Sequence, residues 1–101
     1  MKRRYSDDRE EALVALLKRF YAEEITDGEL LRALRRDVLG LNQTRYAALV
    51  GISRRTLSDL EGDKNNVTLD VKNRVFRPLG LEVSLLPRKR SLLEQILAFS
   101  K

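Results

Sequence analysis

The stretch that most constrains the fold runs from Gln43 to Gly62, with the sequence QTRYAALVGISRRTLSDLEG, and it reads as two short helices joined by a tight turn. Asn42 and Ser53 each precede a helical segment, where a side-chain oxygen can accept a hydrogen bond from a free backbone N–H group. Gly51 lies between the segments, and a glycine adopts a positive φ without strain, so the chain can reverse there. The stretch therefore predicts two helices held at a fixed angle.

Helical spacing gives each of these two helices a buried side. The apolar positions are Tyr46, Ala47 and Val50 in the first helix, and Leu57 and Leu60 in the second. The opposite side of the second helix is polar and carries Arg54, Arg55, Ser58 and Asp59. A rigid helix of this kind can enter the major groove of DNA. Caps and leucine pairs also occur in ordinary helical bundles, and only their combination favours the DNA-binding interpretation.

The segment LGLNQTRYAALVGISRRTLSDLEGDKNNVTLD resembles the helix-turn-helix domain of the XRE or Cro/repressor family, which includes antitoxins of the HipB and HigA kinds. The resemblance covers roughly Leu30 to Leu81. It implies a mostly α, lambda-repressor-like bundle. It also implies that the residue matching Gln43 contacts DNA, and that Glu61 pairs with an arginine one helix upstream, here Arg36.

The residues expected to act on DNA fall into three groups. Base edges would be read by Arg54, Arg55, Ser58 and Asp59. Phosphates would be contacted by Gln43, Thr44, Arg36, Ser53, Lys64 and Lys72. The structural motif would be held by Ala47, Gly51, Leu57 and Glu61.

Asp59 departs from the family pattern, which usually has a basic or amide side chain at this position. Its carboxylate would be repelled by phosphates, although it could accept a hydrogen bond from a cytosine amino group. It also lies four residues after Arg55, and we favour an ion pair that steers that guanidinium, a weak pair in this orientation.

The rest of the chain predicts further helices within a single domain. We expect an N-terminal helix over residues 6–25 and a DNA-binding core over residues 26–80. Thr26 and Glu29 have the spacing of a capping box at the start of a helix. Pro78 predicts an early end or a kink in the last helix of the core, because proline lacks the N–H donor and clashes with the preceding turn.

Residues 81–87 alternate like a half-buried strand, and one strand cannot satisfy its own backbone. The simplest partner is the same strand of a second copy, which would pair through Leu81, Val83 and Leu85 across a dimer axis. LGLEVSLLP also looks like the C-terminal segment of HipB-like antitoxins. A buried extended segment and a continued helix are the alternatives. Residues 88–101 would form a tail or short amphipathic helix that completes the dimer, docks a partner protein or is disordered.

Composition excludes several classes of function. The 101 residues contain no cysteine and no histidine, which excludes zinc fingers, disulfide scaffolds and catalysis by a thiol or an imidazole. We therefore expect no enzyme activity, no metal and no cofactor. The net charge of +5 fits an anionic partner, although eight of the twenty bases lie beyond Gly62. No signal peptide or membrane span is evident, so a cytoplasmic location is expected.

These observations predict a dimeric DNA-binding repressor that acts on a palindromic operator of its own operon. An antitoxin that also binds a cognate toxin protein is one form of this hypothesis, and a stand-alone or phage-type repressor is another. A protein-interaction module that has lost DNA binding is the third reading.

Overall fold

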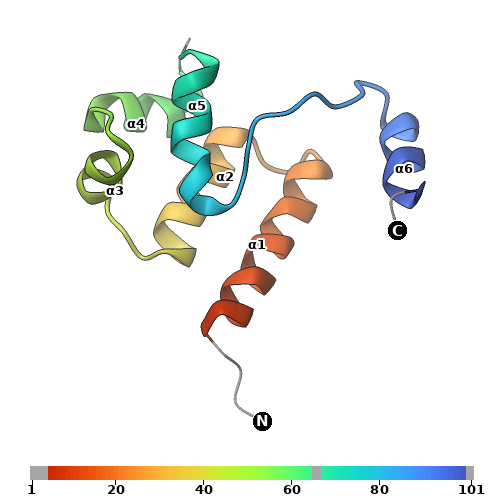
Figure 1. Cartoon of the computed structure of the whole chain (residues 1–101), viewed down its shortest axis with the longest axis horizontal. Helices are drawn as coiled ribbons and strands as arrows, with labels where there is room; N and C mark the ends of the chain where they lie inside the picture. The colour runs from red at the N-terminus through yellow and green to blue at the C-terminus, as the bar shows by residue number, and fades with distance from the viewer. Residues whose placement is uncertain (1–4, 65–66, 100–101) are drawn as a thin grey trace.

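The computed structural model describes residues 5–64 and 67–99, and this part of the chain is mostly helical (Figure 1). It contains six α-helices and no β-strand. The helices are α1 (Tyr5–Tyr21), α2 (Asp27–Ala33), α3 (Gln43–Val50), α4 (Arg54–Glu61), α5 (Leu69–Phe76) and α6 (Arg90–Phe99). A π-helical turn, η1 (Leu34–Val38), extends α2, and a 3₁₀ turn, η2 (Arg77–Leu79), follows α5.

The predicted helix starts of the core are confirmed. Thr26 and Glu29 form a reciprocal capping box at α2, with Glu29 N donating to Thr26 Oγ1 over 3.1 Å and Thr26 N donating to Glu29 Oε1 over 2.9 Å. The side chains of Asn42 and Ser53 each accept a backbone N–H three residues on, as expected. Thr68 caps α5 in the same way. Local side-chain chemistry therefore sets where these four helices begin.

The predicted N-terminal helix over residues 6–25 is wrong at its C-terminal end. α1 ends at Tyr21, because Glu23 takes the left-handed conformation with a φ of 63°. Glu24 N donates to Arg19 O over 2.9 Å and Glu23 N donates to Phe20 O over 3.0 Å, which is the Schellman pattern that ends a helix. A glutamate occupies the left-handed position where a glycine usually ends a helix, so no glycine marks this end in the sequence.

One apolar cluster holds α2 to α5 together, and α1 packs its apolar side against it. Tyr46, Leu57 and Val75 are each 0% exposed at the centre. The other buried apolar residues are Leu30, Leu31, Leu34, Ala47, Val50, Leu60, Phe76 and Leu79. α2 lies between α1 and α4 in this arrangement, so it connects the N-terminal helix to the polar helix α4 (Figure 1).

The start of α2 and the end of α4 approach each other unusually closely. Asp63, with a φ of 58°, accepts hydrogen bonds from Thr26 Oγ1 over 2.6 Å and from Gly28 N over 3.0 Å. A Cβ atom on Gly28 would lie 2.5 Å from Asp63 Oδ1 and 2.6 Å from Leu60 O, so only glycine fits there. An anionic side chain at a helix N-terminus is also favoured by the helix dipole. Asp63 thereby fixes the end of α4 to the start of α2.

The C-terminal region leaves the bundle as an extended segment. α5 ends at Phe76, two residues before Pro78, as the proline predicts, and Gly80 reverses the chain with a φ of 77°. Residues 81–87 then run extended, with Val83 N donating to Asn73 Oδ1 over 2.8 Å. They form no β-ladder with any described residue, because a lone strand has no neighbour to pair with. Pairing of this segment across a dimer stays a prediction.

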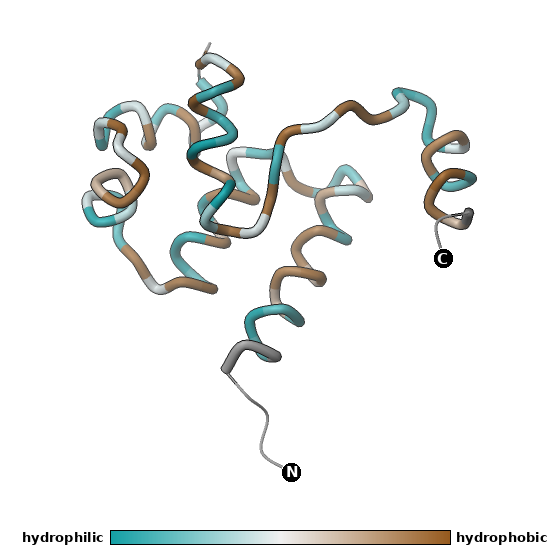
Figure 2. The backbone as a smooth tube through the Cα atoms, viewed as in Figure 1, coloured by the Kyte–Doolittle hydropathy of each residue, from teal (hydrophilic) through white to brown (hydrophobic). Residues whose placement is uncertain are grey.

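Beyond the extended segment, α6 stands apart from α2 to α5 (Figure 1). Figure 2 shows that hydrophobic residues occur along both the extended segment and α6. The tail predicted over residues 88–101 thus contains a helix in its described part.

Candidate nucleic-acid interface

The turn between α3 and α4 has the geometry that the sequence predicts. Gly51 takes φ 75° and ψ 37°, and the backbone N–H groups of Gly51 and Ile52 both donate to Ala47 O. The bond from Ile52 N to Ala47 O is 3.0 Å long, and it is the 6→1 hydrogen bond of a Schellman motif. The Ser53 side chain then accepts from Thr56 N over 3.0 Å and starts α4. The two helices are therefore joined with little freedom.

α4 presents one apolar side to the core and one polar side to solvent. Leu57 is 0% exposed and Leu60 is 6% exposed, whereas Arg54 and Arg55 are both exposed. Ser58 is also exposed, and Asp59 is half-buried. The arginines at the start of α4 are thus free of the fold and available to a ligand.

The predicted ion pair between Asp59 and Arg55 is absent from the described residues. No hydrogen bond or salt bridge joins the two side chains, although they lie four residues apart on α4. An arginine N-terminal to its acid is the weaker orientation of such a pair, and solvent weakens it further. The steering role assigned to Asp59 is therefore not supported in the free protein.

The predicted partner of Glu61 is wrong by one residue. Glu61 pairs with Arg35: Nε lies 2.5 Å from Oε2, and Nη2 donates to Oε1 over 2.9 Å. The two side chains are only 7% and 4% exposed, and Arg35 Nη1 also donates to Leu41 O over 2.7 Å. Arg36 instead pairs with its neighbour Asp37 at the surface, over 3.0 Å.

The position of Arg35 around the helix axis explains why it, and not Arg36, meets Glu61. Arg35 lies four residues after Leu31, which is 1% exposed, so it follows the inward stripe of the α2–η1 helix. Arg36 is one residue further round and faces solvent. The spacing from Leu31 was present in the sequence and could have identified Arg35.

Gln43 belongs to the same buried network. Its Nε2 donates to Glu61 Oε1 over 3.0 Å, and its side chain is half-buried at the start of α3. Glu61 therefore links α3, α4 and η1 at one point. Thr44, the next residue, is exposed, so α3 offers a surface hydroxyl beside the braced glutamine.

A polar hollow next to α4 brings several of the predicted residues together. Gln43, Ser58, Asp59 and Lys64 all line it. Arg32 lines it as well and was missed in the sequence, although it lies one helical turn before Arg35. The hollow thus adds an exposed arginine side chain from α2 to the basic groups beside α4.

The remaining predicted phosphate contacts are placed differently. Ser53 Oγ is engaged with Thr56 at the start of α4, and Arg36 is exposed but paired to Asp37. Lys72 lies 3.5 Å from Asp27 Oδ2 and lines an apolar groove with residues of α1. It is apart from the polar hollow, so the structure does not group Lys72 with Lys64.

Tyr46 supports α3 from within the core. Its hydroxyl donates to Val75 O over 2.5 Å, and the residue is 0% exposed, so the hydroxyl lies within the core. Burial raises the pKa of Tyr46 from 10.0 to about 12, and the nearby charge of Glu61 acts in the same direction. The hydrogen bond ties α3 to α5 behind the exposed face.

Metal-binding clusters and membrane-spanning helices are both absent from the described part of the chain. Residues 5–64 and 67–99 include no group of acidic side chains arranged to hold a metal ion. None of the helices in these residues has the length and apolar character needed to span a membrane.

Comparison with known proteins adds no relative. No protein-family model matches the chain, and no curated protein or solved structure matches it at a significant level.

Proposed function

We propose that this protein is a sequence-specific DNA-binding regulator in which α3 and α4 form a helix-turn-helix unit of the lambda-repressor-like kind. The observation that carries the proposal is the two-sided character of α4. Its apolar side is buried, and its N-terminal arginines are exposed on the other side. A recognition helix needs this arrangement, because the N-terminal residues of such a helix contact base edges while its apolar side holds it on the domain.

The buried network at Glu61 supports the proposal. Base readout requires a recognition helix held at one tilt, since hydrogen bonds to base edges depend on placement. Arg35 and Gln43 both bind the Glu61 carboxylate near the end of α4. Asp63 holds the residues just after α4 against α2. These contacts brace the C-terminal part of α4 and leave its N-terminal part exposed.

In the proposed complex, Arg54 and Arg55 read guanines, and each bidentate contact contributes about 1–3 kcal/mol of discrimination. Lys64, Arg32 and Thr44 contact phosphates and set the register. Two copies bind a palindromic operator with half-site centres roughly 34–36 Å apart. Binding at a promoter would repress the operon by excluding polymerase.

Selection from a random DNA pool tests this function directly. The purified protein should enrich one sequence with two inverted half-sites. Arg55→Ala should relax the preference at one base position of each half-site. Arg19→Ala is the matched control, because Arg19 is an exposed arginine on α1 that pairs with Glu24, away from α4. Enrichment of no sequence by the wild-type protein would refute the proposal.

A further inference from the structure

Exposed apolar side chains are concentrated at the C-terminal end of the chain. We define residues 81–99 as the arm, which comprises the extended segment and α6. Of the ten large apolar side chains that the described residues expose, six belong to the arm: Val83, Leu85, Leu86, Leu92, Ile96 and Leu97. Leu85 is 97% exposed. Such a concentration marks an interaction surface.

α6 has an apolar side that is largely exposed in the described part of the chain. Leu92, Leu93, Ile96 and Leu97 repeat at the spacing of one helix face. Arg90 Nη2 at the start of α6 donates a long hydrogen bond of 3.5 Å to Tyr21 O at the end of α1. The radius of gyration is 14.7 Å, whereas a closed domain of this length has one of roughly 13 Å. The described part of the chain therefore does not close around α6.

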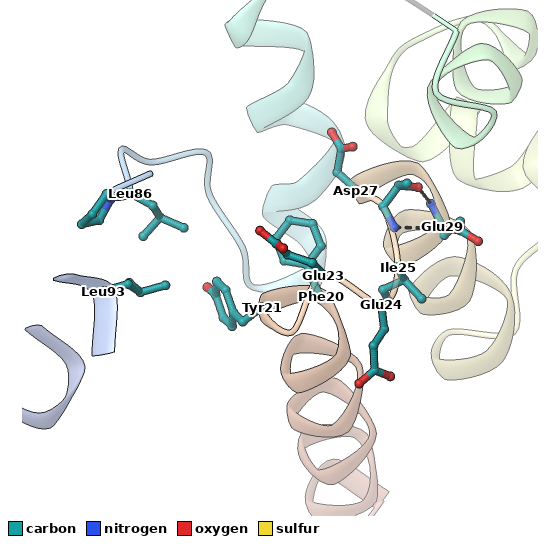
Figure 3. Close-up of a pocket in the computed structure, with 11 residues that line it drawn as sticks. Phe20, Tyr21, Glu23, Glu24, Ile25, Asp27, Glu29, Leu86 and Leu93 are labelled. Atoms are coloured by element: carbon teal, nitrogen blue, oxygen red, sulfur yellow. Dashed lines mark hydrogen bonds between the residues drawn. The ribbon is translucent and has the colours of Figure 1, made fainter. Parts of the chain in front are cut away.

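A hollow of about 500 Å³ lies between α6 and the end of α1 (Figure 3). Phe20 and Tyr21 line it from α1, and Leu86 and Leu93 line it from the arm. In Figure 3, Leu86 and Leu93 lie across the hollow from the two aromatic rings. α6 thus forms one wall of the hollow and leaves the space open.

Pro87 explains why α6 does not fold back into this space. A proline disfavours the helical conformation in the residue before it, so Leu86 is kept extended. The chain therefore continues away from the bundle before α6 begins at Arg90. An arm directed outward in this way can reach a second copy.

The charges of the two sides are complementary. The rim of the hollow carries four carboxylates, from Glu23, Glu24, Asp27 and Glu29. The arm carries three consecutive bases just before and at the start of α6, Arg88, Lys89 and Arg90. The same chain thus supplies an acidic rim and a basic arm, as a self-complementary two-fold contact requires.

We propose that two copies of this chain exchange arms, with α6 of each copy lying in the hollow between α1 and α6 of the other. The two α6 helices then lie side by side at the two-fold axis, and the basic arm of each copy meets the acidic rim of its partner. The inference rests on the proposed function, which requires a two-fold dimer. It adds the segments that form this dimer and assigns a role to α1 and α6.

The absence of cysteine from the sequence gives a direct test. A single introduced cysteine can form a disulfide only with another copy. Leu92→Cys, Ile96→Cys and Leu97→Cys should be made separately and oxidised mildly, since a disulfide needs Cα atoms within about 7 Å. At least one should give mostly disulfide-linked dimer. Leu69→Cys is the matched control, because Leu69 is 60% exposed on α5 and Ile96 is 54% exposed. Equal linkage of all four variants would overturn the proposal.

A charge-reversal experiment tests the contact between the arm and α1 in the partner. One variant carries Glu23→Lys and Glu24→Lys, and the other carries Arg88→Glu and Lys89→Glu. Each alone should raise the dimer dissociation constant at least about tenfold, because like charges then face each other across the axis. An equal mixture should recover a heterodimer of near wild-type affinity. No recovery in the mixture would contradict arm exchange.

Sedimentation equilibrium without DNA separates this inference from the proposed function. The wild-type chain should be a dimer, and the double variant Leu92→Asp with Ile96→Asp should be a monomer. Circular dichroism should show that the double variant is still folded. A dimer that enriches no DNA sequence would refute the function and leave arm exchange standing. A wild-type monomer would overturn arm exchange, and binding of that monomer to anionic lipid vesicles would assign the basic, amphipathic arm to a membrane surface instead.

Discussion

The guanidinium of Arg35 and the carboxylate of Glu61 form a buried, two-point ion pair that connects the α2–η1 helix to the end of α4. Gln43 donates a third hydrogen bond to the same carboxylate. Such a pair is costly to desolvate and adds little net stability, but it has only one good geometry. Its effect is therefore to hold α4 at one orientation relative to α2 and α3.

Removing one member of this pair should be strongly destabilising. Glu61→Ala leaves the Arg35 charge buried without a partner, so the free energy of unfolding should fall by about 3–5 kcal/mol. Arg36→Ala, which removes an exposed pair with Asp37, should change it by less than about 0.5 kcal/mol. Urea denaturation measures both. Equal effects of the two substitutions would show that the buried pair does not brace the fold.

Gly28→Ala should also destabilise the fold. The new Cβ would lie 2.5 Å from Asp63 Oδ1 and 2.6 Å from the Leu60 carbonyl, so α2 and α4 must move apart. A loss of roughly 1–3 kcal/mol is expected from such overpacking. Gly62→Ala is the control, because its Cβ would meet its nearest atom at 3.4 Å and its φ is −90°. Thermal unfolding that ranks the two variants in the opposite order would contradict the close approach.

Tyr46 should make stability fall at alkaline pH. The tyrosine has a pKa of about 12 in the folded chain, against 10.0 ordinarily. Below pH 10.0 it stays protonated in both states and adds no pH dependence. Between these values the unfolded chain releases the proton and the folded chain keeps it. The free energy of unfolding should therefore fall by up to about 1.4 kcal/mol per pH unit.

Tyr46→Phe isolates this effect. The variant should lose roughly 1–3 kcal/mol at neutral pH, because Val75 O loses its donor. Between about pH 8 and about pH 11, its free energy of unfolding should then fall less than that of the wild type. Denaturant titrations at each pH measure this difference. Other alkaline titrations are common to both proteins and cancel in the difference. Parallel pH profiles would show that the folded chain does not retain the Tyr46 proton.

The salt dependence of DNA binding should distinguish two lysines. Lys64 lies in the polar hollow beside α4, whereas Lys72 pairs with Asp27 beside α1. Lys64→Ala should reduce the slope of log affinity against log salt by about one, because one phosphate contact is lost. Lys72→Ala should leave that slope as in wild type. The reverse result would mean that α5 rather than the end of α4 contacts the phosphates.

Local signals in the sequence were sufficient for the helix starts and for the turn. The capping side chains at Thr26, Asn42 and Ser53 and the left-handed Gly51 act within four residues, so their chemistry can be predicted without the fold. The apolar spacing of α4 likewise identified its buried leucines and hence its exposed arginines. These short-range rules predicted most of the candidate site.

The contacts that hold this site were decided by the tertiary structure. Three contacts each join residues at least 26 positions apart in the sequence. They are the pair of Arg35 with Glu61, the hydrogen bond from Gly28 to Asp63, and the hydrogen bond from Tyr46 to Val75. Such contacts depend on how the helices pack. A shift of one residue along a helix turns the side-chain direction by about 100° around the helix axis, so it changes which partner the side chain meets. The chain's local chemistry thus specified the helices and the polar face of α4. Only their packing determined what holds that face in place, because side chains distant in sequence meet only in the folded chain.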